Sequence, residues 1–152
     1  MSKSNVSALE DHLGYWLRYV SNQVSHAFSL KVEARGVTVA EWVVMRELHE
    51  LASTKPSALA DRLGMTRGAI SKLADRLETK TLVARTADTT DRRYQALALT
   101  EAGRSLVPEL SALADRNDAE FFGHLTSGDR ADLQRILKNV VHKRGLRTVP
   151  IN

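Results

Sequence analysis

Two short amphipathic stretches joined by a glycine constrain the fold of this chain more than any other feature. At 3.6 residues per turn, residues 66–80 place apolar side chains on one stripe and polar side chains on the other, and Thr66 suits the N-cap. Residues 56–63 keep the same apolar spacing, and Gly64 is suited to end that first helix. A short glycine-containing turn between two short helices predicts a helix-turn-helix, with an ordinary helical hairpin as the alternative.

The polar side of residues 66–80 has the chemistry of a surface that binds DNA. In a helix-turn-helix the second helix lies in the major groove, where its first side chains reach the edges of the bases. Arg67 can donate to guanine, Ser71 can serve either partner, and Lys72 supplies a cation for phosphate. These three residues are therefore the first candidates for contacts with double-stranded DNA.

The excess positive charge of the chain is concentrated on the same segment. The 152 residues carry a formal net charge of +4, and residues 55–100 hold nine basic against five acidic side chains. The remainder balances thirteen basic side chains with thirteen acidic ones. A basic patch on the predicted helix-turn-helix is what a polyanionic partner requires, and an ordinary solvated basic face is the alternative.

A change of period beyond that helix predicts a β-hairpin. Residues 82–86 and 94–100 have strand-like patterns, and a polar stretch separates them. A hairpin directly after a helix-turn-helix is a wing, and Arg92 and Arg93 at its tip suit the narrow minor groove of A·T-rich DNA. We expect Asp91 to orient one of the two arginines through a bidentate pair. The alternative is a hydrophilic turn with no role.

Long amphipathic helices flank this segment on both sides. Apolar stripes predict one helix over 7–31 and two more that open at Thr100 and Thr126, the last ending near Gly145. Residues 146–152 are expected to be loosely held. The three stripes need a covering surface, and a homodimer built from both ends of both chains would supply it. The alternative is a monomer whose ends pack only on each other.

A further helix is predicted between the first long helix and the helix-turn-helix. Thr38 and Glu41 have the spacing of a capping box, in which each side chain bonds the backbone amide of the other residue. Residues 42–45 are apolar on every side of a helix, so we expect this helix to be buried between layers.

Composition and motifs argue against several function classes. The chain has no cysteine, which excludes a thiol redox sensor, a Cys-ligated zinc site and a disulfide framework. Its five histidines form no recognisable ligand pair, so we expect neither a metal site nor a cofactor. The sequence shows no glycine-rich phosphate loop, nucleophile elbow or carboxylate–histidine cluster, so we do not expect an enzyme.

Nothing in the sequence predicts export or a membrane span. The first residues lack an apolar signal core, and no apolar run approaches ~18 residues. We therefore expect a cytoplasmic protein with no membrane partner, and at this length a single domain.

Several motifs stand in a fixed order along the chain. They are 57–64 (SALADRLG), 66–78 (TRGAISKLADRLE), 82–85 (LVAR), 88–93 (DTTDRR) and 99–103 (LTEAG). In order and spacing the sequence resembles the MarR family of winged helix-turn-helix regulators. The resemblance implies a mainly α fold with a small β-hairpin wing and flanking dimerisation helices. Within one compact fold, it assigns 1–37 to an N-terminal dimerisation helix, 38–100 to the DNA-binding module and 101–152 to C-terminal dimerisation helices.

The resemblance also suggests which residues contact DNA. The first turns of 66–78 match the groove-facing residues of the family, and residues 91–93 match its wing tip. The full set of expected DNA contacts is Ser57, Thr66, Arg67, Gly68, Ser71, Lys72, Arg76, Arg85, Asp91, Arg92 and Arg93.

Members of the family often hold phenolic or aromatic acids between the dimerisation helices and the DNA-binding module, near the first two helices. The corresponding region here offers aromatic walls and an arginine for a carboxylate. The alternative is that the aromatic side chains only fill the core while Arg18 faces solvent. Members that sense peroxides use cysteine, so this chain cannot sense oxidants by that route. The expected ligand contacts are His12, Tyr15, Trp16, Arg18, Tyr19, Trp42 and Arg46.

Together these features predict a sequence-specific DNA-binding transcriptional regulator, of the repressor type, that acts as a homodimer on a pseudo-palindromic operator. Release from DNA by a small aromatic or phenolic effector is a further expectation. The alternative is a winged-helix module that binds only protein, although such a module would not need the excess positive charge on residues 55–100.

Overall fold

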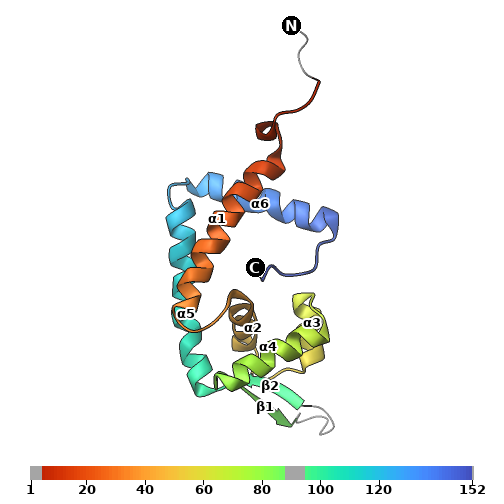
Figure 1. The fold of residues 1–152 in the computed structure, drawn as a ribbon, viewed down its shortest axis with the longest axis vertical. Coiled ribbons are helices and arrows are strands. Elements are labelled where there is room, and N and C mark those ends of the chain that lie inside the picture. Colours follow the sequence, from red (N-terminus) through yellow and green to blue (C-terminus); the bar gives the residue numbers. More distant parts are fainter. Residues whose placement is uncertain (1–4, 88–94, 152) are drawn as a thin grey trace.

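The computed structural model describes residues 5–87 and 95–151 and is mainly helical, with one antiparallel hairpin (Figure 1). The elements are a short 3-10 turn (Leu9–Asp11), α1 (Leu13–Glu33), α2 (Val39–Glu50), α3 (Pro56–Leu63), α4 (Arg67–Thr79), β1 (Val83–Ala87), β2 (Gln95–Leu99), α5 (Glu101–Phe122) and α6 (Ser127–Arg144). Six α-helices and two paired strands in the described residues confirm the predicted fold class.

Side-chain caps fix where the helices begin, as the sequence predicts. Thr38 accepts from the Glu41 N–H at 3.1 Å, and the Glu41 carboxylate accepts from the Thr38 N–H at 3.0 Å, so the capping box forms. Thr66 and Thr126 cap α4 and α6, each accepting from the amide three residues on. Gly64 ends α3 with φ +63°, in the left-handed region that glycine tolerates best.

The N-terminal helix begins later than the predicted span of 7–31. His12 is extended, with φ −99° and ψ 125°, so α1 begins at Leu13 and the 3-10 turn before it is a separate element. The Trp16 indole N–H donates to the Glu10 carbonyl at 2.9 Å and holds that turn against the start of α1. The apolar spacing continues across the break, which is why periodicity alone did not reveal it.

The helices form two regions at opposite ends of the molecule (Figure 1). Helices α2, α3 and α4 gather with the hairpin at one end, and we call Val39–Leu99 the winged module. Helix α1 packs along α5 and leads to the other end, where α6 also lies. Lys31 Nζ joins α1 to α5 by donating to Asn117 Oδ1 at 2.9 Å and to the Glu120 carboxylate at 2.8 Å.

The hydrophobic core lies in the winged module and in the adjoining parts of α1 and α5. Strand β1 pairs with β2 so that Val83 lies opposite Leu99, and both side chains are buried. The largest fully buried apolar side chains include Met45, Leu48, Leu59, Leu63, Ile70, Leu77, Leu97 and Leu110. Residues of α1 and α5 belong to the same core as the winged module, so the core marks no boundary between the three expected parts. The division into 1–37, 38–100 and 101–152 stays a prediction.

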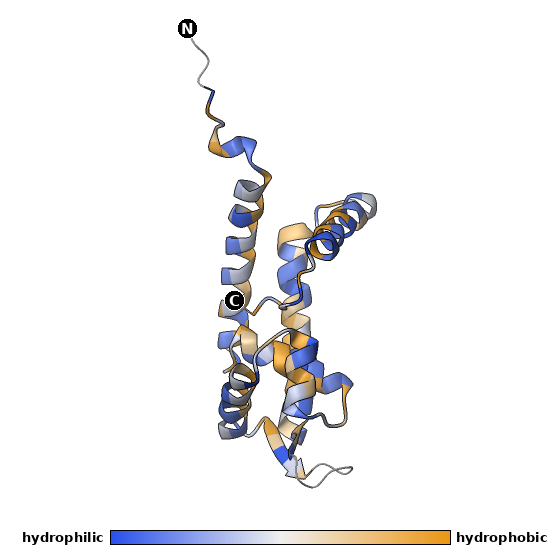
Figure 2. Cartoon of the chain, turned by 90° about the vertical axis from the view of Figure 1, so that its right-hand side faces the viewer, coloured by the Kyte–Doolittle hydropathy of each residue, from blue (hydrophilic) through white to orange (hydrophobic). Residues whose placement is uncertain are grey.

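Helix α6 contributes nothing to this core. None of its residues is buried, and Figure 2 shows it set apart from α1 with apolar and polar residues along its length. Its apolar stripe remains between 38% and 51% exposed and consists of Leu133, Ile136, Leu137, Val140 and Val141. A helix with this pattern needs a further surface to cover it.

The segment that follows α6, which we call the return segment (Leu146–Ile151), is held in place, contrary to the expectation of a loosely held end. The Val149 N–H donates to the Leu63 carbonyl at 3.1 Å, and the Thr148 hydroxyl donates to the Gly64 carbonyl at 3.2 Å. Both acceptors lie at the end of α3, so the segment runs back to the α3–α4 turn. The prediction was wrong because it used only local composition.

Candidate nucleic-acid interface

Helix α4 buries one face and exposes the other, as its sequence predicts. The buried side chains are Ile70, Leu73, Ala74 and Leu77. The opposite face is exposed and carries the predicted contacts Arg67, Gly68, Ser71, Lys72 and Arg76. Among the described residues, its three basic side chains have no ion-pair partner, so their charge is available to an anion. The capped N-terminus of α4 adds the positive end of the helix dipole on the same side.

A cleft of about 370 Å³ lies between the start of α3, the first turns of α4 and the base of the hairpin. Its walls consist of Lys55, Pro56, Ser57, Arg67, Ser71, Ala74, Arg85 and Gln95. The fold therefore brings the predicted contacts Ser57, Arg67 and Ser71 from two helices to one concave surface.

Arg85 differs from the predicted contacts on α4 because its guanidinium group is already paired with carboxylates of the same chain. Its terminal nitrogens lie 2.7 Å from the Asp75 carboxylate and 2.7 Å from the Glu78 carboxylate. The hydrogen bond with Asp75 and the charges of both carboxylates raise the pKa of Arg85, although partial burial opposes them. The side chain is 25% exposed, so Arg85 ties β1 to the polar face of α4.

The far end of α4 is fixed by a buried ion pair. The Glu41 side chain is fully buried, and Lys80 Nζ, just beyond α4, lies 2.9 Å from its Oε1 and 2.8 Å from its Oε2. The same ammonium donates to the Gly36 carbonyl at 2.9 Å. Burial raises the pKa of Glu41, but hydrogen bonds from Lys80 and Thr38 outweigh it and lower the pKa below its ordinary value. The pair holds α4 against the start of α2.

Sequence reasoning missed both of these ties. Asp75 and Glu78 precede Arg85 by ten and seven residues and lie on another element, a separation that no local pairing rule covers. The available signal was a pair of acidic side chains on an otherwise basic helix face. Glu41 was recognised only as a capping residue, because its spacing to Thr38 accounts for it locally.

The predicted wing-tip residues Asp91, Arg92 and Arg93 lie outside the described residues, so their contacts stay a prediction. The strands on either side are described, and their pairing runs to Ala87 opposite Gln95. The hairpin itself is therefore confirmed.

The seven predicted ligand contacts are not gathered at one place. Arg46 forms a 2.6 Å ion pair with Glu50, one turn along α2. Trp42 lines a cleft between α1, α2 and α5, to which the other six do not contribute. The seven divide between two regions: His12, Tyr15, Trp16, Arg18 and Tyr19 at the start of α1, and Trp42 and Arg46 on α2.

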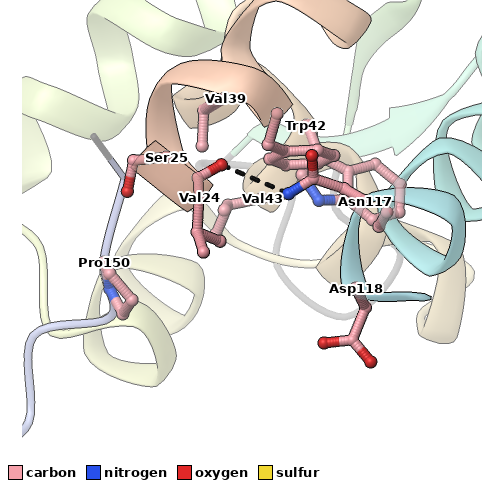
Figure 3. Close-up of a pocket in the computed structure, with 10 residues that line it drawn as sticks. Val24, Ser25, Val39, Trp42, Val43, Asn117, Asp118 and Pro150 are labelled. Carbon is pink, nitrogen blue, oxygen red and sulfur yellow. Dashed lines mark hydrogen bonds between the residues drawn. The ribbon is translucent and has the colours of Figure 1, made fainter. Parts of the chain in front are cut away.

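The cleft beside Trp42 has a volume of about 310 Å³ and mostly apolar walls (Figure 3). The buried Asn117 amide is a fixed polar group of this site, since its Nδ2 donates to the Val24 carbonyl at 3.2 Å. Asp118 at the rim pairs with Arg130. Sequence reasoning did not find these lining residues: Val24, Ser25, Phe28, Val39, Val43, Ala114, Asn117, Asp118 and Pro150.

Two other site types receive no support from the part of the chain that the structure describes. Residues 5–87 and 95–151 contain no group of three or more histidine and carboxylate side chains placed to hold a metal ion. Among the same residues, no helix is both long enough and apolar enough to cross a lipid bilayer.

Comparison with known proteins gives one family. The family model described as MarR family matches residues 37–94, which covers α2 to the hairpin. The HTH-type transcriptional repressor MdtR of Bacillus subtilis (strain 168) is 38% identical over 95 residues, which is 62% of this chain. The matched part spans 61% of the length of that relative.

Solved structures extend the likeness to the flanking helices. A mutant of MarR from E. coli, complexed with operator DNA, has a TM-score of 0.76 at 25% identity, over 85% of this chain and 93% of that one. CouR from Rhodococcus jostii RHA1, bound to p-coumaroyl-CoA, has a TM-score of 0.77 at 28% identity, over 89% and 95%. The YusO protein from Bacillus subtilis has a TM-score of 0.69 at 29% identity, over 90% and 99%.

Proposed function

Because this chain belongs to the MarR family, we propose that it is a transcriptional repressor that binds double-stranded DNA as a homodimer. The observation that carries the proposal is the exposed face of α4, where Arg67, Lys72 and Arg76 have no acidic partner among the described residues. The helix is capped at its start and tied to α2 at its end. It can therefore enter a major groove with little reorganisation.

The exposed residues of α4 take different roles in this proposal. Arg67 and Ser71 reach base edges from the first turns, while Lys72 and Arg76 bind phosphate. Gly68 leaves open space on the same face, since a side chain there would meet nothing within 4 Å, so the DNA backbone can approach closely. The supporting residues Ser57 and Thr66 lie at the starts of α3 and α4, where free backbone N–H groups favour phosphate.

Arg85 has an indirect role in the proposal. Its guanidinium is bonded to Asp75 and Glu78, so it orients the hairpin against α4 and does not itself neutralise a phosphate. The wing arginines, Arg92 and Arg93, remain the proposed minor-groove contacts on sequence grounds.

A homodimer would cover the end of the molecule that consists of the first half of α1 and of α6, which we call the helical end. Large apolar side chains are exposed in two places, on the stripe of α6 and on α1, where they include Leu13, Trp16, Leu17 and Val20. This much exposed apolar surface is unusual for a monomer, and a second copy of the chain can cover it. A twofold dimer also presents two α4 helices to half-sites one helical turn apart.

The cleft beside Trp42 is the proposed effector site, in place of the region around Arg18 and Arg46. Its volume suits one substituted aromatic ring, and Phe28 and Trp42 supply aromatic walls. The described residues that line the cleft include no cation, and Arg130 already pairs with the Asp118 carboxylate, so a neutral phenol fits better than a free aromatic acid. Titration calorimetry with phenols and with benzoates tests this, and heat from neither would remove the proposal for both classes.

Selection of bound duplexes from a random-sequence pool, at roughly physiological salt, tests the main proposal. We expect enrichment of an inverted repeat with half-sites about 10 base pairs apart. A dimeric protein that enriches no sequence would favour the alternative, a winged-helix module that binds only protein.

Binding of the selected duplex by single variants then distinguishes residues that contact DNA from residues that act indirectly. Lys72→Ala should weaken binding and reduce the log–log salt slope by about 0.9, because one phosphate contact is lost. Arg92→Ala and Arg93→Ala should act in the same way. Arg85→Ala should weaken binding with an unchanged slope, since its charge is already neutralised within the protein. An unchanged affinity and slope in both wing variants would remove the wing from the mechanism.

A further inference from the structure

The return segment connects three parts of the molecule that are distant in sequence. After α6 ends at Gly145, the chain turns back and descends toward the winged module (Figure 1). There the Val149 N–H and the Thr148 hydroxyl donate to the last carbonyls before the α3–α4 turn, those of Leu63 and Gly64. The side chain of Val149 packs against the core. The segment thus makes main-chain contact with the turn that precedes α4.

Gly64 shows that the turn is shaped to receive this segment. A Cβ at this position would lie 2.5 Å from the Arg147 carbonyl oxygen and 2.8 Å from the Thr148 Cα, distances that real Cβ atoms do not tolerate. Gly145 has nearly the same backbone, with φ +62° against +63° for Gly64, yet a Cβ there would meet nothing within 4 Å. Glycine at 64 therefore serves the approach of the return segment as well as the end of α3.

One residue further on, Pro150 forms part of the wall of the cleft beside Trp42 (Figure 3). Helix α6 itself contributes no buried residue. The return segment therefore contacts the winged module directly, whereas α6, which precedes it, does not enter the core.

We propose that the return segment is a positioning element that holds the α3–α4 turn, and with it the start of α4, in the orientation that contacts DNA. The proposal rests on the DNA-binding function proposed above and adds Gly64 and Val149 as positioning residues that do not themselves touch DNA. Arg67 follows Gly64 by three residues. If the turn becomes more mobile, the backbone that carries Arg67, the first groove-facing side chain, becomes more mobile too. DNA binding must then order that turn, which lowers affinity without removing a phosphate contact.

The first test uses Val149→Pro, which removes the N–H that donates to Leu63 and changes no charge. Amide hydrogen exchange should become faster at residues 65–70. In a Trp16→Phe background, emission from the remaining Trp42 should shift to longer wavelength as the cleft wall opens. The dissociation constant for the selected duplex should rise roughly three- to tenfold, and the salt slope should stay that of the parent protein.

A second test compares two glycines with the same backbone conformation. Gly64→Ala strains φ and also displaces the return segment, whereas Gly145→Ala strains φ only. Only Gly64→Ala should reproduce the faster exchange, the Trp42 shift and the weaker DNA binding of Val149→Pro. Circular dichroism and sedimentation of each variant confirm that the helices and the dimer are retained.

The outcomes separate this proposal from the one on which it rests. Unchanged exchange and Trp42 emission in Val149→Pro would show that the segment does not hold the turn and would overturn the inference, whatever the protein binds. Faster exchange with unchanged DNA affinity would overturn the positioning role. A lack of specific binding by the unmodified protein would instead contradict the proposed function, and that measurement is made first.

Discussion

The winged module and the helical end of this chain differ in whether their apolar side chains are buried. Among the described residues, every buried apolar side chain lies between Val32 and Leu113. The large exposed apolar side chains all lie between Val6 and Leu30 or between Leu133 and Leu146. The winged module therefore has a core that is complete within one chain. The helical end has an apolar surface that becomes buried only when another surface packs on it.

The two exposed sets are far apart in sequence and lie toward the same end of the molecule, on α1 and on α6, which Figure 2 shows set apart from each other. We expect one partner, a second copy of the chain, to cover both. The comparison indicates that the stability of the winged module comes from burial within the chain. The helical end should instead depend on protein concentration, as expected for an element completed by association.

The largest expected effect comes from placing a charge in the proposed dimer surface. Val140→Asp should convert the dimer to a species of 16.9 kDa at micromolar concentration. An unpaired charge buried in an apolar interface costs about 3–5 kcal/mol, which raises the dissociation constant more than ~100-fold. Sedimentation equilibrium measures the change. Asn139→Asp adds the same charge outside the apolar stripe, about 100° around α6 from Val140, and should leave the dimer intact.

If Val140→Asp remains dimeric, or if Asn139→Asp dissociates equally, the exposed stripe of α6 is not the interface. The exposed apolar residues of the helical end would then need an explanation other than a dimer interface on α6.

A cavity in the winged module should have the next largest effect. Leu97 on β2 is fully buried, so Leu97→Ala should lower the free energy of unfolding by about 2–5 kcal/mol. The dimer dissociation constant should not change. Leu13→Ala removes the same atoms from a side chain that is 81% exposed and should show the reverse pattern. Urea unfolding measures the free energy of unfolding of both variants, and sedimentation measures their dimer dissociation constants. An equal loss of stability in both variants would contradict the difference in burial between the winged module and the helical end.

Local sequence signals account for what could be predicted about this fold. The extent of α4 follows from a 3.6-residue period together with Thr66 at its start, and each of these acts within a few residues. Gly64 and Gly145, which end α3 and α6, were recognisable for the same reason. The hairpin followed from a change of period, and the DNA-contact candidates on α4 followed from its exposed face.

Contacts between distant segments account for what could not be predicted. Arg85 was expected to contact DNA from the resemblance of the motif 82–85, whereas its two carboxylate partners are fixed only by the folded chain. The cleft beside Trp42 takes its walls from α1, α2, α5 and Pro150, so no single stretch of sequence could reveal it. The return segment is short and mostly apolar, and nothing local distinguishes it from a free end.

The buried ion pair of the winged module gives the third prediction. Glu41→Gln should lower the free energy of unfolding at pH 7 by about 1–3 kcal/mol, because the charged hydrogen bond from Lys80 is lost in a buried site. Glu109→Gln, within α5, breaks an exposed pair with Arg35 and should have no measurable effect. Equal effects of the two substitutions would contradict the burial argument.

The pH dependence of the same variant follows from the pKa of Glu41, which the folded protein lowers below the ordinary 4.5. The carboxylate therefore contributes its stabilisation fully above pH 4.5, and loses it as the pH falls through the lower pKa of the folded state. The difference in stability between the parent protein and Glu41→Gln should shrink over that acidic range. Urea titrations at pH 7 and at several pH values below 4.5 measure it, and a constant difference would assign the effect to packing alone.

The smallest expected effect is a stabilisation, at the junction between α4 and β1. Thr81 has φ +60°, a conformation that a β-branched residue adopts only under strain, and its carbonyl accepts from the Thr100 hydroxyl at 2.6 Å. Thr81→Gly keeps that carbonyl and relieves the strain, so it should raise the free energy of unfolding by up to about 1 kcal/mol. Thr79→Gly, in the last turn of α4, should lower it by about 0.5 kcal/mol. Opposite signs in urea unfolding would show that the winged module tolerates local strain because its own core fixes the junction, whereas a loss in both variants would show that Thr81 is not strained.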